Sequence, residues 1–135
     1  MESNKPSKII LQNLLEEYKN SNYELAEKLA LSIIEEFPNH QFAWTVIGAV
    51  YKQTGKLEES ILANKNAVKI APNDPSAHNN LGITLRDSGR LKEAEESLRM
   101  AINLKPNYAE AYNNLGITIK DQEECVKYFR KAIAI

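Results

Sequence analysis

Apolar residues recur along the chain at spacings of three and four, which is the period of an amphipathic helix. The pattern begins near Ser7, and its first stripe consists of Ile10, Leu11, Leu14, Leu15 and Tyr18. A second stripe runs from Leu25 to Phe37, and the helical pattern then continues along the rest of the chain. Residues three and four apart lie on one face of a helix, so each stripe predicts a helix with one buried face.

These stripes are punctuated at a fixed repeat interval. The segment NNLGIT at 79–84 returns unchanged at 113–118. The same interval separates the members of three further sets: Gly48, Gly82 and Gly116; Gly55 and Gly89; Pro38, Pro72 and Pro106. A fixed period of roughly 20 to 50 residues is typical of stacked repeats. The sequence therefore predicts helix–turn–helix units at about 7–40, 41–74, 75–108 and 109–135, after a flexible tail at 1–6.

The residues on this grid resemble the tetratricopeptide repeat, a unit of about 34 residues with the pattern W-x2-L-G-x2-Y…A-x3-F…P. The second unit matches through Trp44, Ile47, Gly48, Tyr51 and Pro72. The third matches through His78, Leu81, Gly82, Leu85, Ala94, Leu98 and Pro106. The fourth matches through Tyr112, Leu115, Gly116, Ile119, Cys125 and Phe129. The resemblance covers 7–135 and implies an all-α fold, a single α-solenoid domain of about four units in a right-handed superhelical stack.

Three glycines lie inside predicted helices, where glycine costs about 1 kcal/mol relative to alanine. They are Gly48, Gly82 and Gly116. A cost repeated at equivalent positions indicates a helix crossing that is too close for a side chain. The small residues expected opposite these glycines are Ala26, Ala94 and Cys125, together with Ser60.

The charge balance and the single cysteine bear on which kinds of partner and which cellular compartment we expect. The net charge is −1, from 17 basic and 18 acidic residues, so no overall field attracts nucleic acid or an anionic membrane. The single cysteine, Cys125, cannot form an intramolecular disulfide. No apolar run is long enough to span a bilayer, and the N-terminus lacks the apolar core of a leader peptide. We predict a cytoplasmic protein whose partners include neither nucleic acid nor membrane.

The sequence offers little for catalysis. A catalytic site needs titratable groups brought together in a pocket. His78 stands at the repeat position of Trp44 and Tyr112 and is expected to pack, and His40 lies in a loop after Pro38. Ser-His-Asp spacing, a phosphate-binding glycine loop and a paired-carboxylate motif are absent. We predict no catalytic residue, no cofactor and no metal site.

Binding of a protein partner is the stronger hypothesis. In proteins similar to this one, the first helices of the units line a concave groove that holds an extended peptide. The NNLG segments resemble the repeats of O-linked N-acetylglucosamine transferase-like proteins, in which the asparagine before Leu-Gly forms a ladder, and this marks Asn80 and Asn114. The peptide-binding residues expected from the periodic columns are Thr45, Asn79, Asn80, Asn113, Asn114, Lys52, Arg86 and Lys120.

Each column has an alternative interpretation. An asparagine amide both donates and accepts hydrogen bonds, so it can bind a peptide backbone, but it can equally bond locally within its own helix. Lys52, Arg86 and Lys120 could hold an acidic partner, or they could offset the dipole at the helix C-termini by about 0.3–1 kcal/mol each. Two other functions also remain open: a substrate-docking domain of a longer enzyme such as a glycosyltransferase, and a self-assembly element.

The last unit departs from the period. The Ala-Ile pair at 101–102 returns at 132–133, an interval of 31 instead of 34, so three residues are missing from its turn. Two structures fit this sequence: a hairpin whose first helix ends near Ile119, or one continuous helix over about 110–134. An apolar face on this unit predicts self-association, with a homodimer as one form. Its residues are Ile119, Val126, Phe129 and Ile133.

Overall fold

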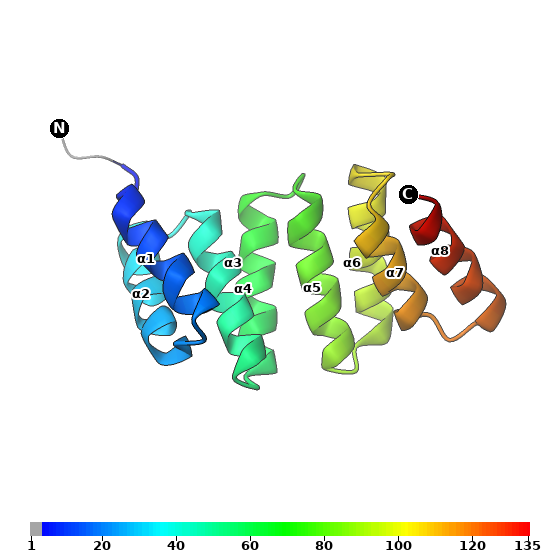
Figure 1. Ribbon diagram of the computed structural model, residues 1–135, viewed down its shortest axis with the longest axis horizontal. Helices are drawn as coiled ribbons and strands as arrows, with labels where there is room; N and C mark the ends of the chain where they lie inside the picture. The colour runs from blue at the N-terminus through cyan, green and yellow to red at the C-terminus, as the bar shows by residue number, and fades with distance from the viewer. Residues whose placement is uncertain (1–3) are drawn as a thin grey trace. The chain divides into compact units, whose positions relative to one another are not determined.

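The chain forms helices that pair into antiparallel hairpins (Figure 1), and the computed structural model describes residues 4–135. In that part of the chain there are eight helices and no strand. They are α1 (Lys8–Lys19), α2 (Tyr23–Glu36), α3 (Gln41–Gln53), α4 (Leu57–Ile70), α5 (Pro75–Asp87), α6 (Leu91–Leu104), α7 (Ala109–Thr118) and α8 (Gln122–Ala134). The predicted all-α fold of helix–turn–helix units is confirmed.

The helices fall into two compact parts, one ending at Ile70 and one beginning at Ala71. From here on these two parts are called unit 1 and unit 2, and each holds two helical hairpins. Unit 1 contains α1 to α4, and unit 2 contains α5 to α8. The two units share a plan: the second helix of the first hairpin packs on the first helix of the second, α2 on α3 and α6 on α7. The first helices also touch within each unit, α1 with α3 and α5 with α7. The single domain expected over 7–135 stays a prediction.

The chain enters its first helix through a capped start. Of the tail expected over 1–6, residues 1–3 lie outside the described residues, and Pro6 is buried. The Ser7 hydroxyl then accepts a hydrogen bond from the Ile10 amide at 3.3 Å. Asp74 caps α5 in the same way, bonding the Ser76 amide at 2.9 Å. Each cap satisfies an amide that the first turn of a helix leaves unpaired.

The turns inside the first three hairpins use one left-handed residue each at equivalent repeat positions. Gly55 and Gly89 have φ of 80° and 85°, and Ser21 takes the same place in the first hairpin with φ of 62°. The left-handed region costs a residue with a Cβ roughly 1–2 kcal/mol, a cost that glycine avoids. The left-handed backbone conformation therefore recurs at the repeat interval, as the buried positions do.

Replacing Gly89 by alanine is expected to lower the free energy of unfolding by about 1–2 kcal/mol, measured by urea denaturation. A Cβ at Gly89 would meet no atom within 4 Å, so the expected loss comes from the backbone alone. Asparagine tolerates left-handed conformations, and Gly89→Asn is therefore the control that should lose less stability. An alanine variant as stable as the unsubstituted chain would contradict this account of the turn.

Each unit has its own apolar core. In unit 1 the buried cluster joins Leu14 of α1, Ala30 and Ile33 of α2, and Ile47 and Val50 of α3. In unit 2 the fully buried large side chains include Leu85 of α5, Leu98 of α6 and Leu115 of α7. Most of these residues lie on the stripes that the sequence predicts to be buried, but Ile10 and Leu25 of the first two stripes are exposed.

The helical glycines do mark close approaches, and the expected Ala94 lies near Gly82 through its carbonyl oxygen, 3.3 Å from the position of an added Cβ, but longer side chains lie closer. A Cβ on Gly82 would lie 2.7 Å from Leu98 Cγ, and one on Gly116 would lie 2.7 Å from Phe129 Cε1. The third glycine, Gly48, faces Asn64 Oδ1 at the same distance of 2.7 Å. Large side chains one turn beyond the expected small residues therefore fill the space. Ser60 does lie close, since its hydroxyl donates to the Gly48 carbonyl at 2.7 Å.

The fourth hairpin excludes the continuous helix over 110–134. Helix α7 ends at Thr118, Ile119 is extended with φ −79° and ψ 136°, and α8 begins at Gln122. The break needs neither glycine nor proline because Asp121 caps α8, its carboxylate accepting from the Glu124 amide at 2.8 Å. An aspartate followed three residues later by glutamate is a helix-start signal. It outweighs the heptad spacing of residues from Tyr112 to Ile133, apolar except for Gln122, which favours a continuous helix across the turn.

A polar cluster holds α8 against α6. Arg99 of α6 bonds Glu95 on its own helix at 2.8 Å and Glu124 of α8 at 3.0 Å. It also donates to the Tyr128 hydroxyl at 2.7 Å. Partial burial acts to lower the pKa of Arg99, but its side-chain hydrogen bonds outweigh burial and raise that pKa above its ordinary value. Arg99 thus stays charged and links two helices that are not consecutive.

Candidate functional site

Two of the four asparagines expected to contact a peptide are hydrogen-bonded to each other, across two helices. Asn114 Nδ2 on α7 donates to Asn79 Oδ1 on α5 at 3.1 Å. Arg86 Nη1 on α5 donates to Asn114 Oδ1 at 3.3 Å. Asn79 and Asn114 are 1% and 7% exposed. This amide network (Asn79, Arg86 and Asn114) runs between two helices and not within one, and it ties the first helices of unit 2 to each other. Contact of these residues with a peptide stays a prediction.

Beside the amide network lie residues that remain accessible. Asn113 and Lys120 are exposed, and Asn80 is half-buried. Ile117 follows Asn113 by one helical turn and is 54% exposed. Its counterpart on α5, one repeat earlier, is the half-buried Ile83. We define the first-helix face of unit 2 as Asn80, Ile83, Asn113, Ile117 and Lys120.

The isoleucines of this face were not among the expected binding residues. Ala49, Ile83 and Ile117 form a further column at the repeat interval. That column stands three residues after the asparagines before Leu-Gly, so it shares their helical face. The signal was present in the same grid that revealed the asparagines. The face therefore combines amide groups with an apolar column.

One member of the expected column of cations, Arg86, is paired within the chain. Arg86 Nε lies 3.6 Å from Asp87 Oδ1, and its side chain is 20% exposed. Lys120 is exposed next to Asp121. Within unit 2, Lys120 is the cation of this column best placed to meet an acidic group.

Two expected binding residues lie in unit 1. Lys52 lies near the end of α3. The Thr45 hydroxyl donates a hydrogen bond to the Gln41 carbonyl of its own helix, 3.1 Å away.

A hydrogen bond at one repeat position ties a first helix to the loop before it. Trp44 Nε1 donates to the Pro38 carbonyl at 2.7 Å, and the Tyr112 hydroxyl donates to the Pro106 carbonyl at 3.0 Å. His78 Nε2 lies 2.7 Å from the Pro72 carbonyl, so that nitrogen carries the proton. Tryptophan, histidine and tyrosine share a polar hydrogen at the tip of a flat ring. A ring N–H or O–H at the same position of each repeat therefore predicts this bond from the sequence. The bond to the Pro72 carbonyl gives His78 a structural role.

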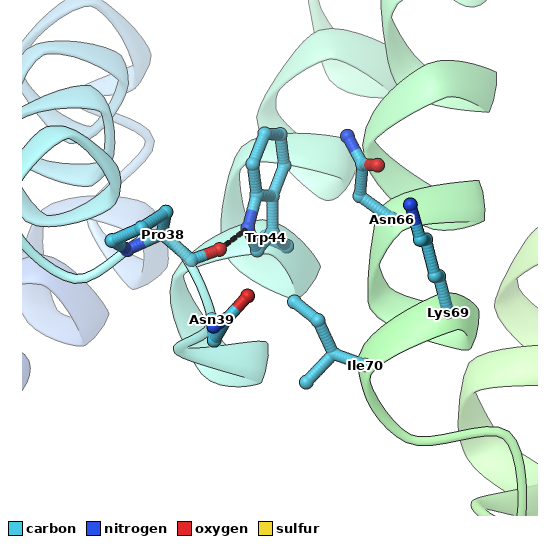
Figure 2. A pocket seen from close by; sticks show the side chains of 6 residues that line it. All are labelled: Pro38, Asn39, Trp44, Asn66, Lys69 and Ile70. Atoms are coloured by element: carbon cyan, nitrogen blue, oxygen red, sulfur yellow. Dashed lines mark hydrogen bonds between the residues drawn. The ribbon is translucent and has the colours of Figure 1, made fainter.

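The Trp44 indole forms one wall of a surface hollow of ≈ 380 Å³ in unit 1 (Figure 2). Pro38 and Asn39 line it from the loop, and Asn66, Lys69 and Ile70 line it from α4. Lys69 is its one titratable lining residue. General acid–base catalysis needs a titratable group of suitable pKa within reach of the reacting atoms, commonly paired with a second. The lining of the hollow supplies one such group, Lys69.

Other titratable side chains are also engaged in packing. Burial raises the pKa of the Tyr51 hydroxyl, and the negative charges of Glu27 and Glu59 raise it further. The His40 ring packs edge-on against Phe42 with a centroid separation of 6.5 Å.

Within residues 4–135, no group of three or more His, Cys, Asp or Glu side chains is placed to hold a metal ion.

None of the helices formed by residues 4–135 is both long enough and apolar enough to cross a bilayer.

The chain matches a family model described as TPR repeat, over residues 48–85 and 84–123. No curated protein sequence matches it. Among solved structures, MamA from Desulfovibrio magneticus RS-1 is 21% identical with a TM-score of 0.87, over 98% of this chain and 76% of that one. The MamA RS-1 ArsTM double mutant is 22% identical with a TM-score of 0.86, over the same shares of 98% and 76%.

A Thermobaculum terrenum O-GlcNAc transferase mutant is 22% identical with a TM-score of 0.82, over 92% of this chain and 26% of that one. At such identities these likenesses show the fold alone. The family match spans more than half of the chain and falls on the interval that places its glycines, prolines and hairpins. The chain belongs to the tetratricopeptide repeat family.

Proposed function

We propose that the first-helix face of unit 2 binds an extended peptide segment of a partner protein. Tetratricopeptide repeats are generally non-catalytic modules for protein interaction. The observation that carries the proposal is the exposed Ile117 one helical turn from the exposed amide of Asn113. The two side chains offer an apolar contact and a hydrogen-bonding group on one surface.

The amide groups suit a peptide backbone. An extended segment has backbone N–H and C=O groups that are not paired within the segment itself. Asn80 and Asn113 can each donate and accept, so they can bond both kinds of group without demanding a particular side chain. Asn79 and Asn114 are buried and bonded to each other, and in this proposal they position α7 against α5.

The apolar column adds selectivity. An aliphatic side chain of the peptide laid on Ile117 and Ile83 would remove apolar surface from water, at roughly 25 cal/mol per Å². Lys120, exposed at the end of this face, favours an acidic residue further along the peptide. The class of ligand is therefore an extended segment that carries an aliphatic residue and, near it, an acidic one.

Replacing Ile117 by glutamate is expected to weaken peptide binding about tenfold or more, a loss of about 1.4 kcal/mol. The probe is a peptide selected from a random display library on the intact chain, with affinity measured by fluorescence anisotropy. Leu62 of α4 in unit 1 is 64% exposed, so Leu62→Glu is the matched control and should bind as the unsubstituted chain does. Equal losses in both variants, or none in Ile117→Glu, would contradict the assignment of this face.

The same face serves the alternative of a substrate-docking domain in a longer enzyme. The likeness to the O-GlcNAc transferase mutant covers 26% of that chain, which leaves most of that enzyme outside the comparison. In both cases the ligand is an extended peptide. The Ile117→Glu measurement therefore tests the surface, whichever protein supplies the peptide.

A further inference from the structure

Helix α8 exposes positions that its counterparts bury. Ala94, Leu98 and Ala101 of α6 are 0% exposed, and Ala26, Ala30 and Ile33 of α2 are also buried. Their counterparts in α8 are half-buried: Cys125, Phe129 and Ala132. Helices α2 and α6 are each followed by a first helix that packs on them, α3 and α7. The hairpin of α7 and α8 has the same type of surface without such a helix in unit 2.

Helix α1 exposes the complementary positions. Ala43 of α3 is 0% exposed and shares a buried core with Ala30 and Ile33 of α2. The counterpart of Ala43 in α1, one repeat earlier, is Ile9, which is 69% exposed. Ile10 follows, at the position of Trp44, and is 43% exposed. Helix α1 thus presents isoleucines where α3 makes contact with the hairpin before it.

The polar groups at these two surfaces also correspond. Inside unit 2, Asn79 of one hairpin bonds Asn114 of the next at 3.1 Å. At the position of Asn79 in the fourth hairpin stands Asn113, and at the position of Asn114 in α1 stands Gln12. Both are exposed. An α1 laid on the last hairpin, as α7 lies on α6, would place these two amides in the same pairing.

We propose that α1 of one copy packs on the α7–α8 hairpin of a second copy, head to tail. Ile9 and Ile10 would cover Phe129 and Ala132, as α3 covers the equivalent positions of α2. Ile133 lies at the edge of this contact: it is 84% exposed, while its counterpart Ile34 packs against the core of unit 1. Such a contact joins two different surfaces, so each added copy leaves one of each surface free, and the assembly grows with concentration.

Two single substitutions test the direction of assembly. Ile9→Glu disables the α1 surface, and Ile133→Glu disables the α8 surface; both side chains are exposed, so the fold should survive. In sedimentation velocity, the unsubstituted chain is expected to form larger species as its concentration rises. Each variant alone is expected to stay monomeric, with association at least about tenfold weaker. Their mixture is expected to form a one-to-one dimer, since it retains one native surface of each type.

Leu62→Glu on α4 is the control and should assemble as the unsubstituted chain does. A Gln12→Cys, Asn113→Cys chain with Cys125→Ser should form disulfide-linked oligomers on oxidation. A chain that stays monomeric at every concentration would overturn the proposal. So would an Ile9→Glu variant that still dimerises while Ile133→Glu does not, because that pattern indicates two α8 surfaces packed on each other.

Discussion

Replacing Leu98 by alanine is expected to lower the free energy of unfolding by about 2–5 kcal/mol. Leu98 is 0% exposed, and it fills the space above Gly82, where its Cγ lies 2.7 Å from the position of an added Cβ. Truncation removes buried apolar surface and leaves a cavity between α5 and α6. Chemical denaturation monitored by circular dichroism measures the loss.

Because Leu98 packs over Gly82, substitutions at the two positions should be coupled, and a double-mutant cycle measures that coupling. Gly82→Ala alone is expected to cost about 1–3 kcal/mol from overpacking, even though alanine favours a helix by about 1 kcal/mol. In the double variant the new methyl group enters the space that Leu98 leaves. The two costs should therefore add up to more than the cost of the double variant, with a coupling of about 0.5–3 kcal/mol.

Met100 provides the control for this cycle because it lies on the same helix and is 45% exposed. Met100→Ala should change the free energy of unfolding by no more than about 0.5 kcal/mol. Strictly additive costs of Gly82→Ala and Leu98→Ala would show that the glycine does not accommodate this leucine.

The sequence was sufficient to predict the fold because the repeat places the same constraints at a fixed interval. The turn positions, for example, bring Gly55 and Gly89 to left-handed φ values, and Ser21 satisfies the same geometry without being glycine. The contact at Gly82 was predictable as a close approach. Its partner was not, since the interval gives the position of a gap but not the side chain that reaches into it. Leu98 reaches further than the alanine expected there.

The sequence left the break before α8 undecided for a different reason. The heptad across 112–133 and the cap at Asp121 make opposite predictions, and no glycine or proline decides between them. The cap prevails because its carboxylate bonds the Glu124 amide at 2.8 Å, and Arg99 then holds α8 through Glu124. Contacts between distant segments, such as the one from Arg99, cannot be read from local spacing.

The candidate site shows the same limit. The columns of asparagine identified the correct helices, but a column does not say which member is buried. Asn79 and Asn113 share one repeat position, yet Asn79 is 1% exposed and Asn113 is exposed. Burial depends on whether a further first helix lies alongside. Repeat position therefore predicts the surface, and the neighbouring helix decides which residues on it stay accessible.

Replacing Asn114 by alanine is expected to lower the free energy of unfolding by about 1–3 kcal/mol. The substitution removes the donor to Asn79 Oδ1, which sits in a residue that is 1% exposed, and it removes the acceptor of Arg86 Nη1. An unpaired buried amide loses its hydrogen bonds to water without replacement. Asn113→Ala, one residue earlier and exposed, is the matched control and should change stability by no more than about 0.5 kcal/mol.

A double substitution separates the amide pair from the rest of the site. Asn79→Ala together with Asn114→Ala removes both partners, so its cost should fall below the sum of the single costs. Peptide affinity should rank Asn113→Ala and Asn114→Ala in the opposite order from the free energy of unfolding: Asn113→Ala should lose more affinity, and Asn114→Ala should lose more stability. Asn113→Ala is expected to weaken binding with the fold unchanged, because its amide belongs to the accessible face. If Asn114→Ala abolished binding while leaving the free energy of unfolding intact, Asn114 would contact the ligand directly, and the amide network would not be what holds α7 against α5.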